Sequence, residues 1–326
     1  MTLNKTDEEE LVQLSEEERA AWNTAVSYYA DWLVQKDLLF DRGMESIKNQ
    51  LENAETSIDL TEIQLPSDLK SMLLKAALVY RRHWWARHDT ENHQWITQVQ
   101  VLVAQYGFSI CDSLVKIYEV QWPEYPVRVD AVAYANWSGA YTTLYPTRPT
   151  ISTTDTANQG IAALEIVFHE TSHGMMNKVT NGLDTAEKAA HAGSPNSPIH
   201  FRRDLWHEVL FYTSGELVAE RVSGYTPYAD KNGLWMRAWP GRDRTVIERD
   251  WKPHMSGAVS LSGALAKLVE DLASTTSNWQ GKCTVSPLSR LPVVWRTGTV
   301  APGDSSEARH EGFSVLSNRS YPSAAF

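Results

Sequence analysis

Two histidines and a glutamate in the segment IVFHETSHGM, residues 166–175, have types and spacing suited to metal chemistry. His169 and His173 are four residues apart, so on an α-helix both imidazoles lie on one face and can reach one metal ion. Glu170 follows the first histidine and can contact a water on that metal. The pattern predicts a Zn²⁺ site. The alternative is a half-buried helix whose two histidines make ordinary hydrogen bonds.

A catalytic zinc ion needs a third protein ligand and an open position for water. The segment FYTSGELVAE, residues 211–220, favours a helix and carries Glu216 and Glu220 four residues apart. Acidic residues in an otherwise apolar stretch are costly unless they have a role, so we expect Glu216 to bind the metal. Glu220 would then accept a hydrogen bond from a ligand histidine. In the alternative, both glutamates face solvent. Other candidates for the third ligand are Glu187 and His191, followed by Asp184, His200, His207 and Glu208.

The two helices together resemble the gluzincin branch of the zincin metallopeptidases, which includes thermolysin-like enzymes and zinc aminopeptidases. The resemblance covers about residues 122–225. It implies a zincin-like fold and a zinc-dependent hydrolase that cleaves a peptide or another amide bond. By this resemblance His169, His173 and Glu216 are the zinc ligands, Glu170 is the general base, and Glu220 supports a ligand histidine.

The resemblance also implies a small β-sheet before the zinc helix, with an edge strand, supplied by residues 133–141, that binds extended substrate. The chain departs from the pattern in two respects. The 42 residues between His173 and Glu216 form a longer spacing than that of the well-known gluzincins, and the second helix reads GELVAE instead of N-E-x-x-S-D. The resemblance therefore indicates a clan and no particular family within it.

Hydrolysis of an amide also needs a donor that stabilises the negative oxygen of the tetrahedral intermediate. Tyr228 and Tyr225 lie in a loop that leaves the second zinc-site helix, and loops of this kind can line a cleft. We therefore expect one of these tyrosines to be the donor, with Tyr212 and His207 as further candidates. Two other functions stay open: a non-catalytic α+β binding protein, and a zinc hydrolase of a small non-peptide amide or ester.

A second group of polar and aromatic residues occurs in RRHWWARHDTENHQW, residues 81–95. His88 and Asn92 are one helical turn apart, and tryptophans surround them. The segment is interpreted either as a wall of the substrate cleft or as a packed aromatic helix with one wet edge.

The periodicity predicts an α+β fold that is predominantly helical. Ser15 and Glu18 form a capping-box pattern at the start of one helix. We expect two or three strands within 125–155, and Asp155 or Thr156 as the cap of the helix that carries the motif. Further helices are predicted at 7–53, at 67–107 with an end at Gly107, at 157–179, at 202–225, at 242–250 and at 258–276, with a loop at 181–200.

These elements suggest three regions. Residues 1–121 form a helical N-terminal region, 122–298 the zincin-like catalytic region, and 299–326 a poorly ordered tail. The composition is that of a globular protein, with 42% hydrophobic and 21% charged residues.

The net charge of −10 and the lack of a basic face argue against a nucleic-acid partner. No apolar run is long enough to cross a membrane. The acidic N-terminus does not look like a secretory signal, so we expect a cytoplasmic protein, or a secreted one if a signal was removed. Cys111 and Cys283 are the only two cysteines, and nothing in the sequence requires them to pair. The oligomeric state is not indicated.

Overall fold

A computed structural model describes residues 3–36, 38, 41–54, 60–123, 126–135, 139–193 and 204–276. The predicted class is confirmed, because the chain is mostly helical and has a small three-stranded sheet. The predictions for the tail at 299–326, for Cys283 and for His200 lie outside the described residues.

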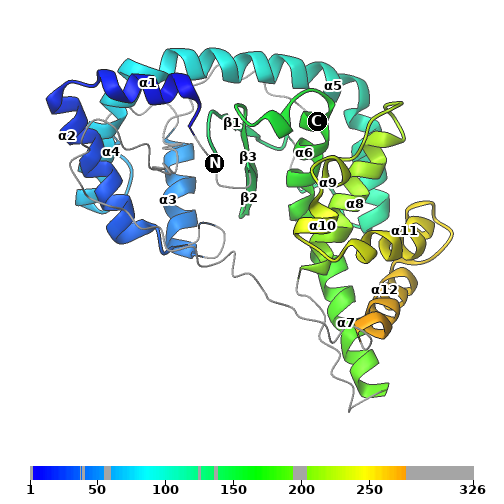
Figure 1. Cartoon of the computed structure of the whole chain (residues 1–326). Coiled ribbons are helices and arrows are strands. Elements are labelled where there is room, and N and C mark those ends of the chain that lie inside the picture. Colours follow the sequence, from blue (N-terminus) through cyan, green and yellow to red (C-terminus); the bar gives the residue numbers. More distant parts are fainter. Residues whose placement is uncertain are drawn as a thin grey trace.

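The N-terminal part is a group of helices in which α2 packs against α4 (Figure 1). Ser15 and Glu18 form the predicted capping box at the start of α2. The residues buried between the helices include Ala25, Leu69 and Leu73. The elements are α1 (Lys5–Gln13), α2 (Glu16–Tyr28), the π-helical turn η1 (Tyr29–Leu33), α3 (Arg42–Asn53), α4 (Ser67–Tyr80) and the π-helical turn η2 (Arg81–Trp85).

Helix α5 (Ala86–Tyr118) runs from these helices across to the C-terminal ones (Figure 1). The prediction that this helix ends at Gly107 is wrong. A glycine inside a helix costs only about 1 kcal/mol, and the turns beyond Gly107 bury Ile110 and Leu114 completely. The helix ends at Tyr118, and Glu119 after it has a left-handed φ of 54°.

The sheet has the strand order β1-β3-β2 and precedes the motif helix, as predicted. Its strands are β1 (Asp130–Val132), β2 (Ala140–Leu144) and β3 (Thr147–Ser152). Strand β1 pairs with β3 in parallel, with Asp130 opposite Thr150, and β2 pairs with β3 antiparallel, with Ala140 opposite Ile151. Strand β2 is therefore an edge strand within the described sheet. It begins at Ala140, so the prediction of an edge strand at 133–141 is wrong in its bounds.

The C-terminal helices surround the main hydrophobic core, whose fully buried side chains include Phe168, Leu210 and Trp251. None of the described helices is long and apolar enough to span a membrane. The elements are η3 (Thr156–Asn158), α6 (Ile161–Ser172), η4 (His173–Met175), α7 (Asn177–Gly193), α8 (Leu205–Ala219), α9 (Tyr228–Lys231), α10 (Leu234–Arg237), α11 (Gly241–Met255) and α12 (Leu261–Thr276).

Two local predictions in this part are corrected. Residues predicted as a loop from 181 onward continue α7 to Gly193, because α7 packs against α12 and Leu265 lies over Gly182. Asp155 caps only the short η3 turn, through its bond from Ala157 N. Helix α6 starts later, after Gly160, whose φ of 60° favours glycine.

Candidate metal centre

Helix α6 places the motif in the interior of the protein. Every residue from Ala162 to Ser172 is buried, and the helix packs against the sheet, α5 and α8. A helix that is apolar nearly all round is stable only in such a position. Its polar residues, among them His169 and Glu170, are therefore held by packing on all sides.

Three histidines meet at this point: His169 from α6, His173 from η4 and His207 from α8. Their ring centroids are 5.1–5.2 Å apart in all three pairs. The Nε2 atoms of His169 and His207 are 3.2 Å apart. One ring nitrogen of each histidine lies within 4.8 Å of the corresponding atoms of the other two, so the three can surround one ion.

This geometry fits a small divalent metal. Zinc binds histidine nitrogen at about 2.0–2.1 Å in tetrahedral sites, which puts two ligand nitrogens about 3.3 Å apart. The 3.2 Å between the Nε2 atoms of His169 and His207 is close to that value. Three protein ligands leave a fourth position open, and the side chain of His173 keeps 18% exposure through which water can arrive. The described residues provide no hydrogen-bond partner for the Nδ1 atom of His169, although a ligand histidine usually has one there.

The three imidazoles are neutral, which metal binding requires. Burial lowers the pKa of His173 to about 3 and that of His207 to about 4. Burial also lowers the pKa of His169 well below its ordinary value, and the charges that His173 and His207 would carry lower it further. Protonating one ring of the cluster is therefore unfavourable.

The carboxylate of Glu170 lies beside the cluster. Its Oε2 atom is 3.8 Å from His173 Nε2 and 2.7 Å from the Oγ1 of Thr142 on β2. The Thr142 hydroxyl also lies 2.9 Å from the backbone carbonyl of Glu170. Burial raises the pKa of Glu170 to about 7, against the lowering effect of the Thr142 bond. The edge strand thus orients this carboxylate at a fixed distance from the histidines.

Glu216, the predicted third ligand, is not part of the cluster. It follows His207 by nine residues on α8, about two and a half helical turns, so the two side chains leave opposite faces of the helix. Glu216 instead pairs with Lys252 at 2.6 Å and with Arg244 at 3.9 Å. Glu220 is 53% exposed and lies 3.8 Å from Arg221, so neither glutamate is placed as the resemblance implied.

The loop tyrosines surround a different carboxylate, that of Glu165 on α6. The Tyr225 hydroxyl donates to Glu165 Oε2 at 2.7 Å, and the backbone N–H of Tyr228 donates to the same atom at 2.8 Å. The Tyr228 ring stacks on Phe211, whose ring centroid is 3.8 Å from that of His169. Tyr225 is thus a hydrogen-bond partner of Glu165, whereas the Tyr228 ring contacts the cluster through Phe211.

The pKa of Tyr228 is raised to about 12, chiefly by burial. The charges of Asp155, Glu165 and Glu170 add to the rise, and that of Glu170 adds least. The Tyr228 hydroxyl therefore stays protonated and able to donate. The ring of Tyr212 faces Arg244, whose guanidinium carbon is 5.6 Å from the ring centroid.

The other predicted ligands lie apart from the cluster. Glu187 and His191 are partly exposed on α7 and pair with each other at 3.7 Å. In the 81–95 segment, His88 is buried between Asp7 at 3.0 Å and the hydroxyl of Tyr80 at 2.9 Å. Trp84 packs against Trp22 in the same part of the molecule, as the packed-helix interpretation expects.

Aromatic side chains enclose the histidines. The Trp206 ring meets that of His173 edge-on at 5.5 Å, and Trp239 meets His207 edge-on at 6.0 Å. Trp239 is held by a hydrogen bond from its Nε1 to Asp204 Oδ2 at 3.0 Å. A low-polarity wall of this kind strengthens electrostatic interactions within it.

Sequence reasoning did not single out Thr142, Glu165 or Phe211, and it ranked His207 below Glu216. Glu165 is an acidic residue inside the apolar run before the motif, and this position could have predicted a buried carboxylate. Comparisons of the chain with protein-family models, with curated proteins and with solved structures found no match. The residues of the site are therefore the only guide to function.

Proposed function

We propose that this protein is a zinc-dependent hydrolase in which His169, His173 and His207 hold the metal. The observation that carries the proposal is the triangle of three neutral imidazoles with the Glu170 carboxylate at its side. Three histidines and one open position are the ligand set of a catalytic zinc site rather than of a closed structural one. This ligand set differs from the gluzincin set, because a histidine replaces the glutamate.

When bound, zinc would supply a Lewis acid that lowers the pKa of water toward about 7 and polarises a carbonyl group. Glu170 would take the proton from the attacking water at Oε2 and deliver it to the leaving group. Thr142 keeps that carboxylate in place through its 2.7 Å hydrogen bond. Tyr228 would donate to the developing oxyanion, a role supported by its protonated hydroxyl and by the contact of its ring with Phe211 beside His169.

An extended peptide or a related amide is the substrate class that the sheet favours. Strand β2 carries Thr142 and is an edge strand of the described sheet, although its residues from Ala140 to Thr143 are buried and Leu144 is the exposed one. The outer edge of a strand presents backbone N–H and C=O groups that can pair with an extended chain. A substrate paired in this way would pass close to Glu170, which Thr142 contacts.

The test compares zinc-loaded wild-type protein with Glu170→Gln on a library of internally quenched fluorogenic peptides. The variant keeps the shape of the side chain but cannot take a proton. We expect it to retain the metal and to lose turnover by about a hundredfold or more. Glu187→Gln, which changes a partly exposed glutamate on α7, is the matched control and should keep full activity.

Two results would oppose the proposal. Zinc-loaded wild-type protein that cleaves no peptide of the library would favour a metal-binding protein without peptidase activity. Full activity of Glu170→Gln would show that the general base is another group.

A further inference from the structure

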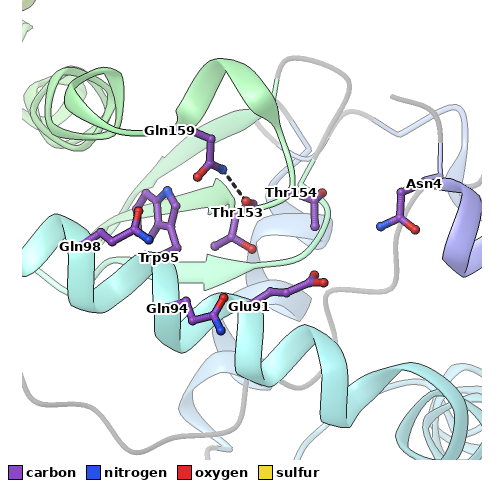
Figure 2. Close-up of a pocket in the computed structure, with 8 residues that line it drawn as sticks. All are labelled: Asn4, Glu91, Gln94, Trp95, Gln98, Thr153, Thr154 and Gln159. Atoms are coloured by element: carbon purple, nitrogen blue, oxygen red, sulfur yellow. Dashed lines mark hydrogen bonds between the residues drawn. The ribbon is translucent and has the colours of Figure 1, made fainter.

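A cavity of about 300 Å³ opens between the start of α1, the middle of α5 and the segment that follows β3 (Figure 2). It contains none of the histidines of the metal cluster, nor Glu170. Its volume is at the lower end of the range for small-molecule sites, about 300–1,000 Å³. A ligand with the size of one or two sugar rings matches such a volume.

The lining is rich in primary amides. Asn4 contributes one from the N-cap of α1, Gln94 and Gln98 contribute two from α5, and Gln159 contributes one from the turn before α6. A primary amide has two donor hydrogens and an acceptor oxygen. Gln159 Nε2 already donates to the carbonyls of Thr153 and Asp155, and Asn4 Oδ1 accepts from Asp7 N, so these two amides keep only their remaining groups for a ligand. Described residues make no hydrogen bond with the side chains of Gln94 and Gln98, so both amides are available to a ligand.

The charge of the lining is also distinctive. Glu91 is the acidic residue among the lining side chains, and its Oε1 atom lies 3.4 Å from the Nη1 atom of Arg87, which is outside the lining. Thr153 and Thr154 add two hydroxyl-bearing side chains, and the lining includes no lysine, arginine or histidine. A site for phosphate or another anion would need basic groups, and a site for an apolar ligand would need more apolar surface than Trp95 alone provides. A neutral ligand with many hydroxyl groups satisfies donors and acceptors of this kind.

Internal hydrogen bonds fix the wall formed by α5 and the segment after β3. The Thr153 hydroxyl donates to Asn92 Oδ1 at 2.6 Å, and Gln159 Nε2 donates to the Thr153 carbonyl at 2.6 Å. The indole N–H of Trp95 donates to the Asn158 carbonyl at 2.7 Å. Groups held in this way lose little freedom when a ligand binds, which favours affinity for a small polar molecule.

A buried ion network holds the opposite wall. Asn4 accepts from Asp7 N at 2.9 Å through its Oδ1 and donates from its backbone N–H to the Tyr134 hydroxyl at 3.0 Å. Asp7 is buried and contacts Arg87 and His88. Figure 2 shows the Asn4 side chain across the opening from Glu91 and Thr154. The 81–95 segment thus contributes both to the packed core and, through Glu91, Gln94 and Trp95, to a cavity wall.

We propose that this cavity is a binding site for a neutral saccharide. The amides of Gln94, Gln98 and Asn4 bridge adjacent hydroxyl groups, and the Glu91 carboxylate accepts from a pair of them. The site is separate from the proposed metal centre and does not depend on hydrolysis.

Saturation-transfer NMR with the full chain tests this site. The probes are glucose, galactose, mannose, N-acetylglucosamine and their β-1,4- and α-1,4-linked disaccharides at millimolar concentration, with inorganic phosphate as a probe of another ligand class. We expect transfer to at least one sugar and none to phosphate. Gln98→Ala should weaken binding about threefold to tenfold, the effect of one neutral hydrogen bond.

Two control variants distinguish sugar binding in this cavity from binding elsewhere on α5 or at the metal centre. Gln105→Ala changes an exposed glutamine two turns further along α5, outside the lining, and should bind the sugar as the wild type does. His207→Ala should also bind normally, because the cavity excludes the histidine cluster. The proposal is overturned by the absence of transfer to every sugar, by transfer to phosphate alone, or by sugar binding that survives Gln98→Ala and disappears in His207→Ala.

Discussion

Gly174 lies in η4, directly after His173 and against Thr147 at the start of β3, and its replacement by alanine tests whether that contact positions His173. A Cβ atom at Gly174 would be 2.4 Å from Thr147 Oγ1 on β3 and 3.1 Å from Pro123 Cγ. The first distance is below the 3.0 Å that real Cβ contacts keep, so the Thr147 side chain or the backbone beside it must shift. Overpacking of this kind costs about 1–3 kcal/mol.

Part of that cost is offset, because alanine restricts the unfolded chain more than glycine does, by about 0.4–1 kcal/mol. We therefore expect Gly174→Ala to lower the free energy of unfolding by about 1–2 kcal/mol in urea titrations. Because Gly174 follows His173 directly, the same shift should displace a ligand nitrogen and weaken zinc affinity about tenfold.

Gly193→Ala is the matched control, because no atom lies within 4 Å of a Cβ at that position at the end of α7. It should leave zinc affinity unchanged and stability equal or slightly higher. If Gly174→Ala proves as stable as Gly193→Ala and binds zinc equally well, the close contact between sheet and motif helix does not position the site.

Three further predictions concern buried polar groups. Burial raises the pKa of Glu165 from 4.5 to about 7, so the protonated carboxyl stabilises the folded state fully below pH 4.5. About 3 kcal/mol of that stability is lost as the pH rises from 4.5 through 7. Glu165→Gln should reduce this loss in urea titrations across that range. Thr142→Val removes the hydroxyl at 2.7 Å from Glu170 and should lower the free energy of unfolding by about 1–2 kcal/mol with zinc content unchanged. Asp7→Ala removes the buried partner of Arg87, which keeps its 3.4 Å contact with Glu91, and should cost about 2–3 kcal/mol, measured by thermal unfolding; a loss below about 1 kcal/mol would mean that the network does not hold α1.

The sequence predicted that His169 and His173 would lie close together, because their spacing of four residues on continuous helical backbone fixes their relation. It could not tell which side chain of α8 joins them, because that depends on the rotation of α8 relative to α6. The argument that acidic residues in apolar stretches need a role applies in the structure to Glu165 and Glu208, which are fully buried. Glu216, to which it was applied, is neutralised by Lys252, which follows far along the chain.

The fold, like the candidate site, was predictable where local patterns decide it. The capping box at Ser15, the sheet before the motif and the helices near 242–250 and 258–276 follow from local patterns. The continuation of α5 through Gly107 and of α7 through Gly182 depends on side chains from other helices, such as Leu265, that cover those glycines or their neighbours. A glycine or a polar stretch does not end a helix where packing against other elements buries enough apolar surface.

The most direct test of the three-histidine centre is the metal content of purified protein, measured by plasma mass spectrometry after zinc is supplied and the excess removed. The wild type and Glu216→Gln should each hold about one zinc ion per chain, and His207→Ala should lose it. A wild-type protein without zinc would contradict the metal centre. Loss of zinc in Glu216→Gln with retention in His207→Ala would contradict its ligand set and restore the gluzincin arrangement.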